Sequence, residues 1–325
     1  MTPPSLHESP VMAEPRLRVE TDVADVSRRV VALIAEGSRL VRPRIAVMVL
    51  VTVSAAAWIT TAGDRMPVVA FVGLLVGTAL VAASSSIANQ ILEWQTDRRM
   101  PRTADRPIAA GRLTVGAGWW LATVSLVAGL AIMTRSCGWP PALAALATWL
   151  LYVGVYTPMK RWSPLNTAVG AVAGAMPVAI GWAAAGGPAR LAGGDVAAAL
   201  AVAALGTVLY LWQFPHFMAI AWLYRRHYAA AGLRMLTVDD PSGLRAAGQS
   251  LAAALAMIPV SLVLAVPSGS IRLFLAAGAA SIVYAVVTVR FAIRRDDTSA
   301  RGLLLVSIGT LLAVLTAAIA FTPLR

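Results

Sequence analysis

Charged residues and cysteine are both scarce in this chain of 325 residues. Asp, Glu, Lys and Arg together make up 13% of the sequence, whereas soluble globular proteins carry roughly 25%. Hydrophobic residues reach 58%, and the mean hydropathy is +0.74. The single cysteine, Cys137, excludes an intramolecular disulfide and a cysteine-based metal cluster. The composition therefore excludes an ordinary soluble domain.

The N-terminus also lacks the pattern of a targeting signal. No basic stretch is followed there by an apolar core and a small-residue cleavage site, so we expect no signal peptide. Acidic residues in 1–43 argue against an acid-poor organellar transit peptide. Pro3, Pro4 and Pro10 predict that this cytoplasmic N-terminal segment, 1–43, is partly disordered. Within it, Val23–Leu40 is expected to form a short amphipathic surface helix.

Long apolar segments dominate the rest of the chain. Nine of them lie near 44–62, 67–92, 115–133, 140–157, 164–185, 195–222, 248–266, 271–291 and 302–322. Segments of this length cross a bilayer as helices, because a chain in lipid must satisfy its backbone hydrogen bonds internally. The sequence therefore predicts an all-α fold, a polytopic membrane bundle of nine transmembrane helices over 44–322.

Positive charge is unevenly divided between the two sides of that bundle. With the N-terminus in the cytoplasm, 22 of the 27 Lys and Arg residues fall on the cytoplasmic side, as the positive-inside rule requires. Topology thus accounts for the net charge of +12, and we expect the lipid bilayer, and no nucleic acid, as partner. We predict a multi-pass protein of the bacterial plasma (inner) membrane, with the C-terminus outside. The basic loops 93–114 and 223–247 would then share one side.

Three oxygen-bearing side chains occur at the end of the second apolar segment, four residues apart. Asn89, Glu93 and Asp97 would lie on one face of a continuing helix and span about 12 Å at 1.5 Å per residue. Magnesium prefers one or two carboxylates together with the oxygens of a substrate phosphate. The spacing therefore predicts a Mg²⁺ site formed by these three residues.

Arginines follow this stripe at once, as Arg98, Arg99, Arg102, Arg106 and Arg112. Guanidinium groups match the geometry of phosphate oxygens, so acids that bind metal beside arginines indicate a diphosphate site at the membrane surface. The alternative is a solvated interfacial loop whose arginines only reflect topology.

Several further blocks occur in order along the chain. They are Asn89-x3-Glu93-x3-Asp97, Met100-x-Arg102-Thr103-x2-Arg106-Pro107-x3-Gly111, Tyr156-Thr157, Gly174-Ala-x-Pro177 with Gly181-Trp182, Trp212-Gln-Phe-Pro-His-Phe217, and Tyr228-x2-Ala231-Gly232-x2-Met235. Together they resemble the UbiA-type intramembrane prenyltransferases, and within them the branch that farnesylates protohaem IX. The resemblance covers about 44–322, and the Arg-Thr…Arg-Pro and Pro-His-Phe blocks are the ones typical of the haem branch.

This resemblance implies a fold, a reaction and a set of site residues. The fold is a nine-helix bundle with a central cavity open to the cytoplasmic side. The reaction transfers the farnesyl group of farnesyl diphosphate to the 2-vinyl group of protohaem IX (haem B), with addition of water, for haem A and cytochrome oxidase biogenesis. Haem A synthase is an expected downstream partner. The implied catalytic residues are Asn89, Glu93, Asp97, Arg102 and Arg106, the first three of them holding Mg²⁺. The implied substrate-binding residues are Lys160, Arg161, Tyr156, Gln213, His216, Arg225, Arg226, His227 and Tyr228.

The sequence does not assign a single role to His227 or to His216. An acid is expected directly before the Tyr228 block, but His227 stands there, and histidine is a poor Mg²⁺ ligand. A second Mg²⁺ is therefore in doubt. Asp239 and Asp240 could supply the missing acid or lie on the loop surface, and the surface position is expected. For His216, three interpretations remain: it orients or ligates haem, it hydrogen-bonds the diphosphate, or it is a satisfied polar group within the bundle.

Two other functions fit parts of the sequence. A UbiA-type prenyltransferase acting on an aromatic or quinone precursor would share the metal site. A transporter or a non-catalytic haem-binding membrane protein would not need one, and paired repeats with broken helices, typical of transporters, are not seen. The Pro-His-Phe and Arg-Thr…Arg-Pro blocks favour haem as the acceptor.

Overall fold

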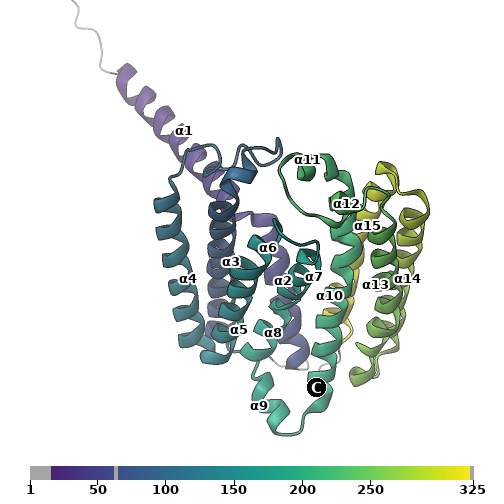
Figure 1. The fold of residues 1–325 in the computed structure, drawn as a ribbon. Helices are drawn as coiled ribbons and strands as arrows, with labels where there is room; N and C mark the ends of the chain where they lie inside the picture. Colours follow the sequence, from purple (N-terminus) through teal and green to yellow (C-terminus); the bar gives the residue numbers. More distant parts are fainter. Residues whose placement is uncertain (1–15, 62–64, 323–325) are drawn as a thin grey trace, which may run out of the picture. The chain divides into compact units, whose positions relative to one another are not determined.

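The computed structural model describes residues 16–61 and 65–322, and helices are the regular structure found there (Figure 1). The disorder predicted around Pro3, Pro4 and Pro10 lies outside these residues. Within them, nine helices are long and apolar enough to cross a membrane: Pro43–Thr60, Val68–Asp97, Val115–Cys137, Trp139–Met159, Asn166–Ala184, Val196–Leu223, Leu244–Ser268, Ile271–Arg294 and Asp297–Ala320. The nine predicted segments match them within five residues at every end. The predicted multi-pass, all-α bundle is confirmed.

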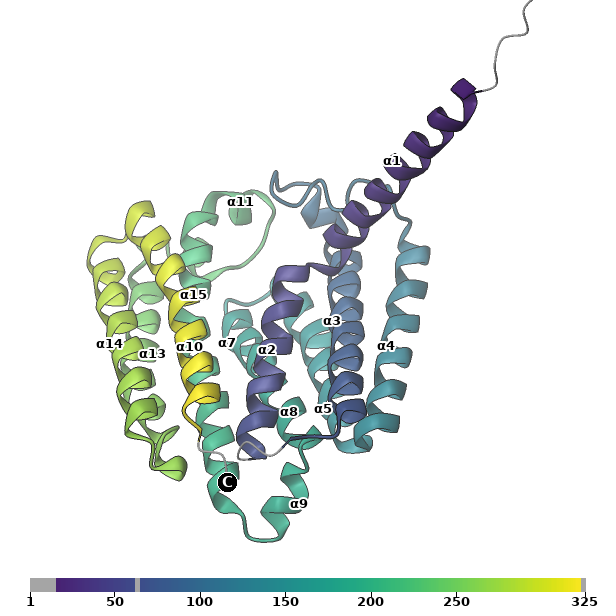
Figure 2. The same ribbon diagram turned by 180° about the vertical axis from the view of Figure 1, so that it is seen from behind.

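The helix bundle, from Leu40 onward, is a unit separate from the segment that ends at Arg39. Its long helices are α2 (Pro43–Thr60), α3 (Val68–Asp97), α4 (Val115–Cys137), α10 (Val196–Leu223), α13 (Leu244–Val263), α14 (Ile271–Arg294) and α15 (Asp297–Ala320). Helix α3 packs along α4, α13 packs against α10 and α14, and α15 packs against α10, α14 and α2. Seen from the front and from behind, α3 and α4 lie at one side and α13 and α14 at the other (Figures 1 and 2).

Two membrane crossings are interrupted where proline occurs. The first consists of α5 (Trp139–Trp149), a π-helical stretch (Leu150–Tyr156) and α6 (Thr157–Met159). Pro158 has no N–H to donate and its ring would clash with the carbonyl four residues earlier, so the turn before it widens and the Thr157 N–H bonds to the Tyr152 carbonyl. The second consists of α7 (Asn166–Ala175) and α8 (Pro177–Ala184), which meet at Met176. The π-helical turn of the first crossing is of a type that occurs frequently at functional sites.

Glycine permits close approach between neighbouring helices. A Cβ atom at Gly181 on α8 would collide with the Val53 carbonyl oxygen on α2, and one at Gly170 on α7 would collide with the Tyr156 ring. A Cβ atom at Gly174 would collide with the Gln213 side chain on α10. These glycines therefore serve packing, the ordinary role of small residues between helices in lipid.

The basic connections between helices meet at one end of the bundle. They include α11 (Arg225–Ala230) and α12 (Leu236–Asp239), whereas α9 (Gly187–Ala192) lies at the opposite end (Figure 1). Met100 of the connection 98–114 packs with Tyr228 and Leu233 in one apolar cluster. The Arg234 N–H donates to the Lys160 carbonyl oxygen at 2.8 Å. The prediction that the two basic loops share one side is confirmed.

The N-terminal helix, α1, spans Arg16–Val41 and starts earlier than the predicted Val23–Leu40. Val26, Val30 and Ile34 recur at intervals of four residues, which places them on one helical face. Their exposed fractions are 59%, 47% and 66%. This exposed apolar stripe is the pattern that an amphipathic surface helix requires.

Candidate active site

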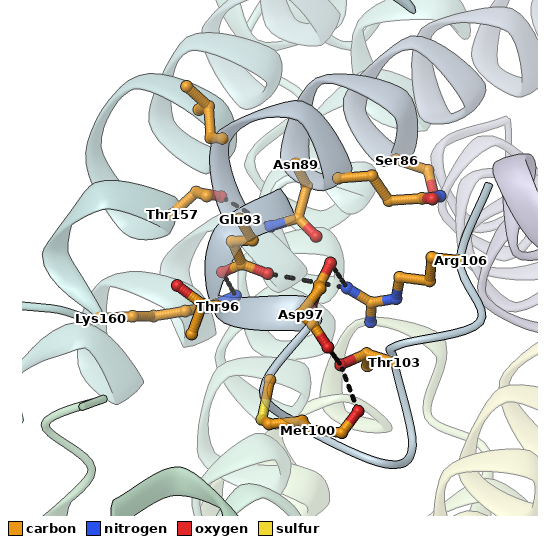
Figure 3. A network of polar contacts seen from close by, with 12 residues as sticks. Ser86, Asn89, Glu93, Thr96, Asp97, Met100, Thr103, Arg106, Thr157 and Lys160 are labelled. Carbon is orange, nitrogen blue, oxygen red and sulfur yellow. Dashed lines mark hydrogen bonds and ion pairs between the residues drawn. The ribbon is translucent and has the colours of Figure 1, made fainter. Parts of the chain in front are cut away.

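The three predicted metal ligands lie on one face of α3, because that helix continues as far as Asp97 (Figure 3). The exposed fraction is 0% for Asn89 and Asp97 and 8% for Glu93. A buried carboxylate is stable only where it is paired or coordinates a metal. The identity of its neighbours therefore decides what this stripe can do.

Asp97 is held by the loop that follows it. Its Oδ2 atom pairs with the Arg106 Nη1 atom at 2.5 Å, and the Thr103 hydroxyl donates to the Asp97 carbonyl oxygen at 3.1 Å. Arg98 closes the same loop by donating from Nε to the Ala109 carbonyl oxygen at 2.7 Å. Asp97 Oδ1 is buried without a hydrogen-bond partner. The loop thus brings Arg106 back onto the end of α3 and leaves one carboxylate oxygen available.

Glu93 accepts from a lysine on a different helical segment. Lys160, directly after α6, places its Nζ atom 2.8 Å from Glu93 Oε1 and 4.4 Å from the centre of the Tyr156 ring. Arg106 Nη1 lies 3.9 Å from Glu93 Oε2, so it faces both acids. Burial alone would lower the pKa of the Lys160 ammonium, but the Glu93 carboxylate outweighs it and the pKa is raised.

Asn89 is the third member, and its partner is a residue that the sequence did not indicate. The Asn89 Oδ1 atom accepts from Arg42 Nη2 at 3.0 Å, and its Nδ2 atom donates to the Thr157 hydroxyl at 3.1 Å. Arg42 precedes α2 with a left-handed backbone, φ 52°. Two residues before Arg42, the Leu40 carbonyl oxygen accepts from Ser86 at 2.9 Å and from Gln90 at 2.8 Å. These bonds hold the start of α2 against α3.

Three cations therefore surround the stripe, each from a different segment: Arg42, Arg106 and Lys160. Burial, together with the nearby Arg42 guanidinium, lowers the pKa of Arg106, while Asp97 and Glu93 oppose that shift. Arg42 has no apparent signal in the sequence, because an arginine before Pro43 also suits an ordinary interfacial helix start.

The donor set fits magnesium. All the candidate ligand atoms are oxygens, two carboxylates and one amide, and the unpartnered Asp97 Oδ1 lies among them. Among the described residues, no three His, Cys, Asp or Glu side chains form a metal-binding group. Such a set leaves coordination positions for phosphate oxygens, which is the usual arrangement for Mg²⁺ with a phosphorylated substrate.

Two of the predicted phosphate-binding arginines lie outside this cluster. Arg102 is exposed, and its guanidinium lies 4.9 Å above the Tyr224 ring. Arg161, next to Lys160 in the chain, donates to the Leu92 carbonyl oxygen at 3.0 Å and lies 3.4 Å from the Thr96 hydroxyl. It therefore binds the backbone near the end of α3 and does not contact the acids.

The residues that follow α10 are also separate from the stripe. Arg225 pairs with Asp297 Oδ1 at 2.9 Å, and Arg226 and His227 are exposed. Tyr228 is buried in the cluster that contains Met100. Asp239 pairs with Arg234 at 3.3 Å, which leaves it on the loop surface as expected. Asp240 binds Ser242 and the Arg245 N–H.

Gln213 and His216 both have partners within the bundle. Gln213 Nε2 lies 3.2 Å from the Ala171 carbonyl oxygen and 3.1 Å from that of Leu209. His216 Nδ1 lies 2.7 Å from the Ser307 hydroxyl on α15. Gln213 therefore ties α10 to α7, and His216 ties α10 to α15.

Known proteins share both the sequence and the fold of this chain. A profile of the UbiA prenyltransferase family matches residues 49–311. A protoheme IX farnesyltransferase from Rhodopirellula baltica is 41% identical over 85% of this chain and 96% of the relative. One from Koribacter versatilis is 34% identical over 72% of this chain and 73% of the relative. A UbiA homologue from Archaeoglobus fulgidus, solved with DMAPP and Mg²⁺, matches with a TM-score of 0.60 at 16% identity. That match covers 88% of this chain and 99% of the other.

Proposed function

We propose that this chain, which belongs to the UbiA prenyltransferase family, transfers the farnesyl group of farnesyl diphosphate to protohaem IX and adds water, giving haem O. The observation that carries the diphosphate half of the proposal is the buried stripe Asn89, Glu93 and Asp97, ringed by three cations. The haem half is supported by the relative that is 41% identical and carries that activity in its name.

The diphosphate is held by the cations that already face the stripe. Arg106, Lys160 and Arg42 each reach an oxygen of α3 from a different segment, so a diphosphate placed against the stripe meets three donors. Asn89, Glu93 and Asp97 would hold Mg²⁺, which when bound neutralises diphosphate charge. Arg102 and Arg161 are assigned to the rim of the same site.

The chain's own residues favour departure of the diphosphate. The farnesyl C1–O bond breaks and its electron pair leaves on the diphosphate, where Arg106 and Lys160 stabilise the growing negative charge. The 2-vinyl group supplies the electron pair of the new C–C bond, and water adds its hydroxyl and releases a proton.

The protein is a multi-pass membrane protein, and we assign the shared end of the basic loops to the cytoplasm. The positive-inside rule supports this orientation, with the N-terminus inside and the C-terminus outside a bacterial plasma membrane. The exposed Arg226 and His227 lie at that end, and we assign them to the haem propionates. Haem A synthase would receive the product.

The test uses the full chain in lipid with ferrous protohaem, farnesyl diphosphate and Mg²⁺. Mass spectrometry of the extracted haem should show the gain of one farnesyl group and one water. Asp97→Ala should abolish this gain, and so should chelation of the metal. Asp239→Ala, which removes a carboxylate from the loop surface, is the matched control and should retain the product. Unmodified haem with the native chain would overturn the haem assignment.

A further inference from the structure

Three helices orient the imidazole of His216. Its Nδ1 atom lies 2.7 Å from the Ser307 hydroxyl on α15, and its ring stacks on Trp212 at 4.7 Å between centres. Trp212 is held in turn, because its Nε1 atom donates to the Ser307 carbonyl oxygen at 2.6 Å. The Tyr284 hydroxyl of α14 donates to the Trp212 carbonyl oxygen at 2.7 Å.

The hydroxyl of Ser307 determines which ring nitrogen carries the proton. Ser307 donates its only hydroxyl hydrogen to the Leu304 carbonyl oxygen at 2.6 Å. It must therefore accept from His216, so Nδ1 carries the proton and Nε2 of the neutral ring has a lone pair. Among the described residues, Nε2 has no hydrogen-bond partner, and it is not one of the fully buried unpartnered atoms. The lone pair is therefore unpaired in the described structure and not fully buried.

This tautomer separates the interpretations that the sequence left open. A nitrogen lone pair cannot donate a hydrogen bond to a diphosphate oxygen. Within the part of the chain that the structure describes, only one of the two ring nitrogens has a hydrogen-bond partner, so the contact with Ser307 does not satisfy both polar atoms of the ring. A neutral imidazole whose Nδ1–H is fixed by a protein acceptor is the form that ligates iron, and histidine is a common axial ligand of haem.

The depth of His216 suits a haem beside the diphosphate site. His216 precedes the end of α10 at Leu223 by about 10 Å, and Asn89 precedes the end of α3 at Asp97 by about 12 Å, at 1.5 Å per residue. Both helices end at the side where the basic connections meet. We infer that His216 Nε2 is an axial ligand of the haem iron in the substrate complex, oriented by Ser307; this rests on the proposed haem farnesyltransferase function.

The test measures iron ligation without the transfer reaction. The full chain in phospholipid nanodiscs is titrated with ferrous protohaem, and resonance Raman spectroscopy detects the iron–histidine stretch. His216→Ala should lose that band and raise the apparent Kd at least about tenfold, and added imidazole should restore the ligated spectrum. An unchanged band and Kd in His216→Ala would overturn the inference.

Two further variants exclude indirect effects. The chain has three histidines, so the double variant His7→Ala, His227→Ala should keep the band at saturating haem, although loss of the propionate contact at His227 should weaken haem binding. Ser307→Ala should keep a ligated spectrum but weaken haem binding about tenfold, because it removes only the orienting acceptor. Loss of the band in the double variant would assign the iron ligand elsewhere.

The same preparation separates failure of this inference from failure of the proposed function. Farnesyl diphosphate and Mg²⁺ are added, and the haem is analysed by mass spectrometry. A band that depends on His216 without farnesylated haem would overturn the proposed reaction and retain the ligand assignment. Farnesylated haem with an unchanged band in His216→Ala would overturn only the ligand assignment.

Discussion

The connections 98–114 and 224–243 are both rich in arginine and meet at one end of the bundle, yet they differ in what their cations contact. In the first, Arg106 folds back onto two buried carboxylates of α3. In the second, Arg225 and Arg234 pair with Asp297 and Asp239, whose side chains are 50% and 19% exposed. A count of cations therefore does not locate the site. Buried carboxylates that pair with cations identify the candidate site, because a buried carboxylate needs a charged partner whereas a carboxylate in water does not.

The largest expected effect comes from the cation that faces both acids. Arg106→Met should lower the rate of prenyl transfer by on the order of 10²–10³-fold, the usual loss when one donor to a developing anion is removed. The matched variant Arg102→Met removes an exposed guanidinium that contacts Tyr224, and it should have a smaller effect. Initial rates by mass spectrometry at saturating farnesyl diphosphate would measure both. Equal losses would contradict the distinction between these two residues.

Lys160 and Arg161 are adjacent in the chain, but only Lys160 contacts a buried acid. Lys160→Met should reduce farnesyl transfer about 100-fold and destabilise the protein by about 3 kcal/mol, because Glu93 is left buried without its ammonium partner. Arg161→Met removes only contacts with Leu92 and Thr96. Thermal unfolding in detergent measures the loss of stability, and the transfer rate is measured separately on the same preparation. A larger rate loss in Arg161→Met would argue against Lys160 as the diphosphate ligand.

Arg42 tests whether the site extends to the start of α2. Arg42→Met should weaken farnesyl diphosphate binding about tenfold, the value of one charge-assisted hydrogen bond. Arg44→Met removes a guanidinium two positions further on that is exposed, so it serves as the control. Binding is measured by titration with a non-hydrolysable farnesyl diphosphate analogue. Equal affinities for the native chain and Arg42→Met would confine the site to α3, its loop and Lys160.

The smallest effect is expected in the second basic connection. Arg225→Met breaks the pair with Asp297, whose side chain is half exposed, and pairs of this kind contribute about 0–1 kcal/mol. We therefore expect the rate to change by no more than about fivefold. Asp297→Asn should behave in the same way. A loss comparable with that of Arg106→Met would show that this connection also acts on the diphosphate.

Much of the fold follows from local features of the sequence. The nine crossings match the apolar segments because helices in lipid need long apolar runs. The Asn89, Glu93 and Asp97 stripe was predictable because a four-residue spacing places side chains on one helical face. The surface position of Asp239 was also expected. The end of α3 and the start of α15 were less accurate, since both helices extend into polar sequence beyond the apolar run.

The sequence by itself determined the membrane bundle and the stripe of oxygen-bearing side chains, because each depends on residues close together in the chain. The tertiary structure decided which cations join that stripe and which ring nitrogen of His216 pairs with Ser307. Arg42 and Asn89 are separated by 47 positions, Lys160 and Glu93 by 67, and His216 and Ser307 by 91. Such contacts depend on how whole helices pack, and helix packing is not encoded by local spacing.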